Sequence, residues 1–336
     1  MILTYLIRLA CLSFACFFLV QLVLGVGVSL LAPVSLALAQ RAKPRFAAGF
    51  LFAMRMLPAF AGILVVALVC VPSYLWLEAD ADGERVGVAC LGAALIGLAG
   101  WTMAIARGLF AIRRSLEYER QCRLTGRESR ILASSTADSS GGETALVVDD
   151  AGGMVAMAGI ARPQLVVSRA VLEELSAEQL EAALRHERAH RISRDNLKRL
   201  LLLLTPDVIP GCARFLGGLQ AMERSWARFT EWAADDFAVA GDARRRASLA
   251  AALVRVARLG GAMPASPLMT SLMADGCDLE ARVERLLEGP TTRASAGRHR
   301  AIFAVAALLC SVCAGVAAVN PATLKAAHGL LEYLLR

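Results

Sequence analysis

Four long apolar runs constrain this chain more than any other feature, because uncharged runs of about 20 residues rarely occur in water-soluble cores. The runs lie within Leu9–Leu38, Pro58–Leu77, Val86–Ala106 and Ala301–Val319. Each is long enough to cross a bilayer as a helix. Hydrophobic residues make up 57% of the chain, more than an ordinary soluble protein carries. The sequence therefore predicts a multi-span α-helical membrane protein.

The end of the first run also resembles a signal-peptidase site, Ala37-Leu38-Ala39. The apolar run before it is longer than the usual apolar region of a signal peptide, and Arg8 alone forms a basic start. We therefore expect the first run to remain as a membrane span, with cleavage after Ala39 as the alternative.

The charges that flank the runs predict how the chain crosses a cell's inner (plasma) membrane. Basic residues dominate the first loop, the region after the third run and the region before the fourth: Arg41, Lys43, Arg45, Arg107, Arg113, Arg114, Arg120, Arg123, Arg293, Arg298 and Arg300. Acidic residues dominate the second loop: Glu78, Asp80, Asp82 and Glu84. Cytoplasmic loops carry the excess of Lys and Arg, so we expect the central region inside and both termini outside. Contact with anionic lipid accounts for much of the net charge of +7, and no basic-aromatic groove indicates a nucleic-acid partner.

We expect three parts along the chain. Residues 1–112 hold three spans with short loops, residues 113–300 form one cytoplasmic domain, and residues 301–336 hold the fourth span and a short outer tail. Within the central part, Ser134–Glu143 is rich in Ser and Gly and predicts a linker.

The central part begins with short strands and continues with helices. We expect strands at Thr144–Val148, Met154–Ala158 and Gln164–Val167, and a loop at Gly260–Gly276, which contains two prolines. Leu200–Leu204 is an apolar patch that either packs inside the domain or rests on the membrane surface.

The segment His186-Glu187-Arg188-Ala189-His190 points to chemistry. Two histidines four residues apart share one face of a helix and can hold one metal ion. Glu187 then faces the open side of that metal, where it can take a proton from a water molecule. Ser176 and Gln179 fit a capping box that starts this helix. The alternative is a surface helix with incidental charges, because several arginines lie in the same segment.

A catalytic zinc usually has three protein ligands and one open position, so a third ligand is needed. Most of the nine cysteines lie in apolar runs and the rest are isolated, which fits a reducing compartment without disulfides. His299 and His328 lie in or beyond the last membrane segment. Glu231 and Asp235 remain, four residues apart on a predicted helix. One of them can bind the metal while the other accepts a hydrogen bond from a ligand histidine, or both can simply solvate a helix face.

Taken together, the His-Glu-x-x-His segment, Arg194-Asp195-Asn196 and the Glu231-x-x-x-Asp235 pair resemble the gluzincin membrane peptidases. The closest resemblance is to the BlaR/MecR-type family of integral-membrane zinc peptidases, with the HtpX and CAAX-prenyl-protease family as a more distant one. Gly159–Ser168 resembles the strand before the family's active-site helix, and Leu279–Leu287 resembles a helix after its catalytic core. The resemblance covers roughly residues 1–320 and is sharp only from about 145 to 288.

This resemblance implies a cytoplasmic α+β gluzincin-type metallopeptidase domain that binds one Zn²⁺ per chain. The implied roles are zinc ligand for His186, His190 and Glu231, catalytic base for Glu187, and support of a ligand histidine for Asp235. Arg228 matches an arginine often found three residues before the family's ligand glutamate, so we expect it to stabilise the oxyanion or, alternatively, to form a salt bridge. Asp195 is expected to anchor the end of the active-site helix.

By the same resemblance we expect a membrane-anchored zinc endopeptidase that cleaves a cytoplasmic protein, with a transcriptional repressor as the expected substrate. An extended substrate is expected along an edge strand near Met154–Ala158. Antibiotic-sensing members carry a large extracellular domain after the last span, whereas here Pro321–Arg336 follows, so we expect a separate sensor partner or the lipid to bring any signal. Two alternatives remain open: HtpX-like quality control of membrane proteins, and a non-catalytic zinc-stabilised signalling scaffold, which would not need Glu187.

Overall fold

The computed structural model describes residues 2–77, 87–131, 143–149, 152–160, 163–207, 217–260, 268–272, 279–289 and 329. The fourth apolar run, nearly all of the Ser134–Glu143 linker and nearly all of the C-terminal tail lie outside these residues. The described chain is mostly helical and contains one small mixed sheet. Three helical segments are long and apolar enough to cross a membrane: Tyr5–Leu30, Pro44–Trp76 and Val88–Thr125. They overlap the first three predicted runs, and they are called the candidate spans below.

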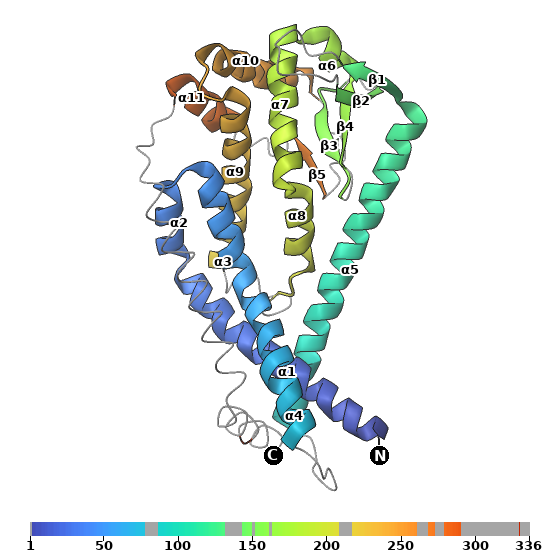
Figure 1. The fold of residues 1–336 in the computed structure, drawn as a ribbon, viewed down its shortest axis with the longest axis vertical. Coiled ribbons are helices and arrows are strands. Elements are labelled where there is room, and N and C mark those ends of the chain that lie inside the picture. The colour runs from blue at the N-terminus through green and yellow to red at the C-terminus, as the bar shows by residue number, and fades with distance from the viewer. Residues whose placement is uncertain are drawn as a thin grey trace.

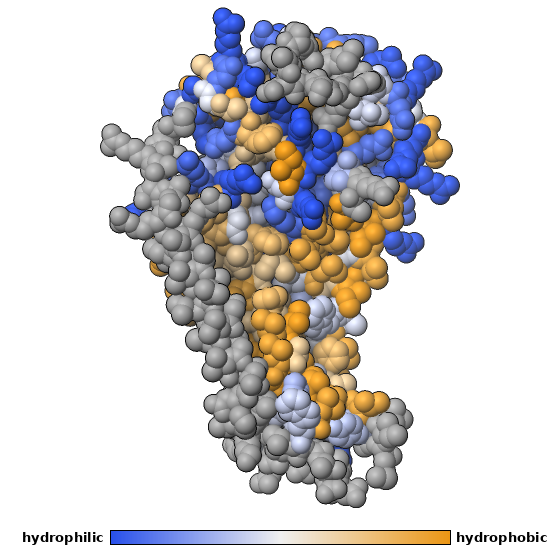
Figure 2. Space-filling model, in the orientation of Figure 1, coloured by the Kyte–Doolittle hydropathy of each residue, from blue (hydrophilic) through white to orange (hydrophobic). Residues whose placement is uncertain are grey.

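The candidate spans occupy the lower, elongated part of the molecule (Figure 1). Their elements are α1 (Ile2–Leu30), α3 (Pro44–Val65), the π-helical segment η1 (Val66–Cys70), α4 (Val71–Leu77) and α5 (Val88–Thr125). The short helix α2 (Ala32–Gln40) lies between the first two spans. Pro44 starts α3, where its missing N–H costs no hydrogen bond. On the visible face hydrophobic residues cover much of this lower part, and hydrophilic residues gather at the upper end (Figure 2).

Helix α5 joins the two ends of the molecule. It holds 38 residues, which at 1.5 Å per residue makes it about 57 Å long, roughly twice the hydrocarbon core of a bilayer. Its first half is apolar and its second half carries most of its charges. The predicted boundary near residue 112 therefore falls inside one continuous helix, which leads through Gly126 directly into the sheet.

The sheet has the order β1-β2-β4-β3-β5, and only β2 and β4 run parallel. Its strands are β1 (Arg127–Ile131), β2 (Glu143–Val148), β3 (Val155–Ala158), β4 (Gln164–Ser168) and β5 (Met269–Ser271). The three predicted strands are confirmed within one residue at each end. Strand β1 was not predicted.

Strand β5 corrects two expectations. It lies within Gly260–Gly276, where a loop was predicted. The prediction missed this strand because three residues with no local pattern become a strand only by pairing with a distant partner. That partner is β3: Met157 pairs with Thr270 on one side, while β4 pairs with β3 on the other. Among the described strands, β5 and not β3 is therefore the edge on this side of the sheet, and the prediction of an edge strand at Met154–Ala158 is wrong.

Six further helices lie in the described part of the chain: α6 (Arg169–Glu174), α7 (Ala177–Ser193), α8 (Asp195–Leu204), α9 (Gly217–Val239), α10 (Ala243–Leu259) and α11 (Leu279–Glu288). A core of buried residues from the sheet, α7 and α10 holds the upper part together. The predicted capping box is confirmed, with Ser176 Oγ accepting from Gln179 N–H and the Gln179 side chain accepting from Ser176 N–H. The structure thus starts α7 where the sequence predicted.

Helices α8 and α9 pass from the upper part down between the candidate spans. Leu202 packs in one cluster with residues of α1, α2, α3 and α9, and Leu200 packs beside Ala111 of α5. The apolar patch Leu200–Leu204 therefore packs inside the molecule, which was one of its two predicted placements. Below it, Gln21 of α1 donates to the Pro206 carbonyl at 2.5 Å, so polar groups also fix the end of α8.

Candidate metal centre

Helix α7 brings the three residues of the His-Glu-x-x-His segment into the interior. His186 and Glu187 are 0% exposed and His190 is 2% exposed. They are buried because α7 packs against α9 on one side and the sheet on the other. The predicted alternative of a surface helix with incidental charges therefore does not describe these three side chains.

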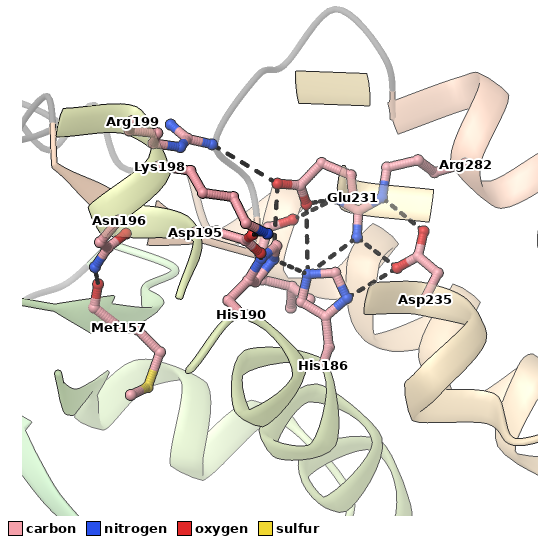
Figure 3. Close-up of polar contacts among 11 residues, drawn as sticks. Met157, His186, His190, Asp195, Asn196, Lys198, Arg199, Glu231, Asp235 and Arg282 are labelled. Atoms are coloured by element: carbon pink, nitrogen blue, oxygen red, sulfur yellow. Dashed lines mark hydrogen bonds and ion pairs between the residues drawn. The ribbon is translucent and has the colours of Figure 1, made fainter. Parts of the chain in front are cut away.

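Helix α9 presents Glu231 to both histidines (Figure 3). Nε2 of His186 and Nε2 of His190 are 3.1 Å apart, and the Glu231 carboxylate oxygens lie 3.4 Å from the first and 3.7 Å from the second. A tetrahedral zinc ion with bonds of about 2.0–2.2 Å holds its ligand atoms about 3.3–3.6 Å apart. His186, His190 and Glu231 therefore form a buried group that could hold a metal ion. Their donor set, two imidazoles and one carboxylate, suits zinc.

Each histidine also contacts a carboxylate through its other ring nitrogen. Nδ1 of His186 lies 2.9 Å from Asp235 Oδ1, and Nδ1 of His190 lies 2.8 Å from Asp195 Oδ2. Such carboxylates orient a ligand imidazole and raise its basicity. The contact of Asp235 agrees with the role that the family resemblance implied. Asp195 was expected only at the helix end, but the break after α7 turns it back onto His190.

Arg282 of α11 completes the cluster, and sequence reasoning missed it. Its Nε and Nη2 donate to the two oxygens of Asp235 at 3.0 and 2.7 Å, and its Nη1 lies 3.3 Å from Glu231. Although burial raises the pKa of the Asp235 carboxyl, Arg282 and His186 outweigh it and lower that pKa to about 2. A signal was present in the sequence: Arg282 stands on the apolar face of α11, between Leu279 and Leu286.

Glu187 differs from the other carboxylates of the cluster. Its two oxygens are buried and have neither a hydrogen-bond nor an ion-pair partner among the described residues, whereas the Glu231 oxygens form ion pairs with both histidines and with Arg282. Burial raises its pKa to about 7, although His186 and His190 act in the opposite direction. A carboxylate of this kind takes up a proton near neutral pH, as a general base must.

Arg228 lies apart from this cluster. Its guanidinium carbon stands 5.4 Å from the ring centre of Trp232 and 5.8 Å from that of Phe229, distances typical of cation–π contacts. Within the described chain, no ion pair joins Arg228 to Asp195 or Glu231. The arginines that reach Glu231 are Arg282 and, at 4.0 Å, Arg199. The arrangement gives no support to an oxyanion role for Arg228, since its side chain is turned to the aromatic rings.

Comparison with models of known protein families found no matching family, and comparison with curated proteins found no matching protein. What the site can do therefore follows from its own residues. Two imidazoles and one carboxylate surround a position for a metal, and an unpaired carboxylate lies in the residue after the first histidine. This combination suits hydrolysis with a metal and a general base.

We expect Asp195→Asn to weaken metal binding about 10–100-fold, because it removes the charge that supports His190 while keeping the shape of the side chain. Asp236→Asn is the matched control, since Asp236 pairs with Arg285 at the surface and lies next to the cluster. The measurement is the zinc affinity of the purified full-length protein by competition with a chromogenic chelator. Equal affinities for the two variants would remove Asp195 from the metal centre.

Proposed function

We propose that this protein is a membrane-anchored zinc endopeptidase that cleaves cytoplasmic proteins, with a transcriptional repressor as the expected substrate class. The single observation that carries the proposal is the buried group of His186, His190 and Glu231 with the unpaired carboxylate of Glu187 beside it. A signalling scaffold would need the three ligands alone. Burying the Glu187 carboxylate without a partner costs stability, so its presence favours catalysis over a structural metal.

The mechanism assigns one task to each residue. His186, His190 and Glu231 would hold a zinc ion, which would supply Lewis-acid chemistry toward the scissile carbonyl and lower the pKa of a bound water. Glu187 accepts the proton of the attacking water and delivers it to the nitrogen of the leaving amine, so the proton balance closes. Arg282 and the carboxylates beside the histidines hold the ligands in place. An extended substrate segment would add to the sheet at β5 rather than at β3.

We further propose that the upper part of the molecule faces the cytoplasm. Lys43, before α3, lies near Asp236 at the upper end of α9, because its positive charge acts to lower the pKa of the Asp236 carboxyl. In contrast, α4 ends and α5 begins at the lower end of the molecule (Figure 1). The basic first loop and the ends of α4 and α5, where the acidic loop is attached, thus lie at opposite ends of the candidate spans. Truncated reporter fusions after Lys43 and after Asp82 should give an inside and an outside signal, respectively. An outside signal from a fusion within residues 134–142 would contradict this orientation.

Quality control of membrane proteins is a second candidate, favoured by one observation. Helices α8 and α9 pack directly on the candidate spans α1, α3 and α5, so a substrate held in the membrane lies within reach of the site. Substrate trapping separates the candidates: Glu187→Gln protein should retain its substrates, which are then identified by mass spectrometry. Soluble DNA-binding proteins support the first candidate, and membrane proteins with exposed spans support the second. Trapping of the same proteins by a His186→Ala/Glu187→Gln control would contradict both.

A further inference from the structure

A cavity of about 530 Å³ lies at the break between α7 and α8, and His190 forms part of its wall. Ligand pockets usually measure about 300–1,000 Å³. His190 belongs both to this wall and to the group that could hold a metal ion, so a molecule in the cavity contacts one of the proposed ligands. The cavity is therefore a candidate site for part of a molecule that reacts at the metal.

The wall combines apolar, polar and charged side chains. The apolar residues come from β3, the segment before β4, and α8: Met157, Ile160, Pro163 and Leu197. Among the buried polar residues of the wall, His190 and Asp195 pair with each other. The third, Asn196, is 4% exposed and donates through Nδ2 to the carbonyl of Met157 at 3.1 Å (Figure 3) and to that of Gly159 at 2.8 Å. Its Oδ1 is buried without a partner among the described residues. A peptide could fill the apolar part of the cavity with a side chain and donate a backbone N–H to Asn196 Oδ1.

The rim of the cavity is positively charged. Arg191 and Arg194 line it. Arg194 is exposed, and no hydrogen bond or ion pair of its side chain joins it to another described residue. The nearby Asp195 does not cancel this charge, because His190 and Lys198 already pair with it. A ligand carboxylate would therefore meet an available guanidinium.

The backbone at Arg194 gives an independent reason to single out this position. Its φ of 54° and ψ of 43° are left-handed, a conformation that is unfavourable for a residue with a Cβ. Glycine or asparagine would relieve this cost. Strained residues of this kind cluster at functional sites, so an arginine here needs a reason beyond the turn.

We propose that this cavity is a peptide subsite that selects a bulky apolar side chain flanked by an acidic residue. The apolar side chain fills the space beside Met157, a backbone N–H donates to Asn196 Oδ1, and the neighbouring carboxylate pairs with Arg194. This rests on the proposed function, and it names the substrate class that the site takes. An anionic lipid headgroup would also meet arginines, but contact with His190 favours the substrate of the metal centre.

Binding to zinc-loaded, full-length Glu187→Gln protein tests the subsite without requiring turnover. The probes are short fluorescein-labelled peptides with a central Phe flanked on both sides by Glu, by Gln or by Lys. We expect the Glu peptide to bind about threefold to fivefold more tightly than the Gln peptide at low salt, as for a single exposed ion pair. Arg194→Asn, which tolerates the left-handed backbone, should abolish this difference, and Arg194→Glu should transfer the preference to the Lys peptide. Arg194→Lys should keep it.

Arg188→Glu is the matched control, because Arg188 is exposed on the same helix and does not line the cavity. It should leave the order of the three peptides unchanged. Equal affinities for the three peptides, or a preference that does not respond to Arg194, would overturn the proposal. So would Arg194 variants that lose binding to phosphatidylglycerol vesicles while keeping the peptide preference, since the arginine would then serve lipid.

The failure of the subsite and the failure of the proposed function give different results. If wild-type protein cleaves the peptides but Arg194 does not affect their order, the subsite is wrong and the peptidase stands. If the order follows Arg194 but wild-type protein cleaves none of the peptides and no trapped protein, the subsite stands and the endopeptidase is wrong.

Discussion

Replacing Glu187 by glutamine should leave about one zinc ion per chain and lower the rate of peptide cleavage by about 10²–10⁴-fold, the usual contribution of a general base. The amide keeps the shape of the carboxylate but cannot take the water proton. Burial already disfavours the charge of Glu187, as its raised pKa shows, so the neutral residue should not destabilise the fold. Metal analysis of the preparation measures the zinc content, and cleavage of a trapped substrate by the same preparation measures the rate.

Two further variants serve as controls for this result. His186→Ala should lose both zinc and activity, because it removes a ligand. Glu181→Gln, the same change on the same helix but outside the metal cluster, should lose neither. Wild-type cleavage by Glu187→Gln would show that the assigned base is wrong, whatever the metal content.

Arg282→Met should be the most destabilising single change in the upper part of the molecule. It leaves the buried carboxylates of Asp235 and Glu231 without their cation, and breaking a buried ion pair in this way costs about 3–5 kcal/mol. The effect should be larger in metal-free protein, because a bound dication would itself offset the charge of Glu231. Thermal unfolding with and without a chelator measures both effects.

Arg285→Met is the control for this prediction. Arg285 lies on the same helix, but it pairs with Asp236, whose side chain is 47% exposed, and such pairs contribute about 0–1 kcal/mol. The double variant Arg282→Met/Asp235→Leu should recover part of the loss, since apolar residues can replace a buried pair. Equal destabilisation by Arg282→Met and Arg285→Met would show that the buried cluster is not held by Arg282.

The parts of this fold that sequence could predict are those set by neighbours along the chain. Ser176 and Gln179 fix the start of α7 within one turn, and uncharged runs fix the candidate spans, because both signals are local. Short stretches of strand-forming residues likewise predicted β2, β3 and β4. Of the metal cluster, the histidine spacing and the Glu231–Asp235 spacing are helical repeats, so the spacing alone places each pair on one face of its helix.

What could not be predicted depends on contacts between distant segments. Strand β5 exists because it pairs with β3, more than a hundred residues earlier in the chain. Arg282 belongs to the cluster because α11 packs against α10 and its arginine reaches Asp235 of α9, which no spacing in the sequence states. The spacing of Arg228, three residues before Glu231, likewise could not state that its guanidinium contacts the rings of Phe229 and Trp232.

The packing of α9 on α3 has a consequence for how the protein is made. Ribosomal synthesis delivers α1, α3 and α5 before α7 and α9, and N-terminal segments generally fold first. Met222, Trp226 and Phe229 of α9 are buried largely against α3, so α9 can pack in its final position only after α3 has formed. Glu231 follows two residues after Phe229, and the metal centre is therefore completed last. We therefore expect a nascent chain that fails to enter the bilayer to remain without the proposed peptidase activity.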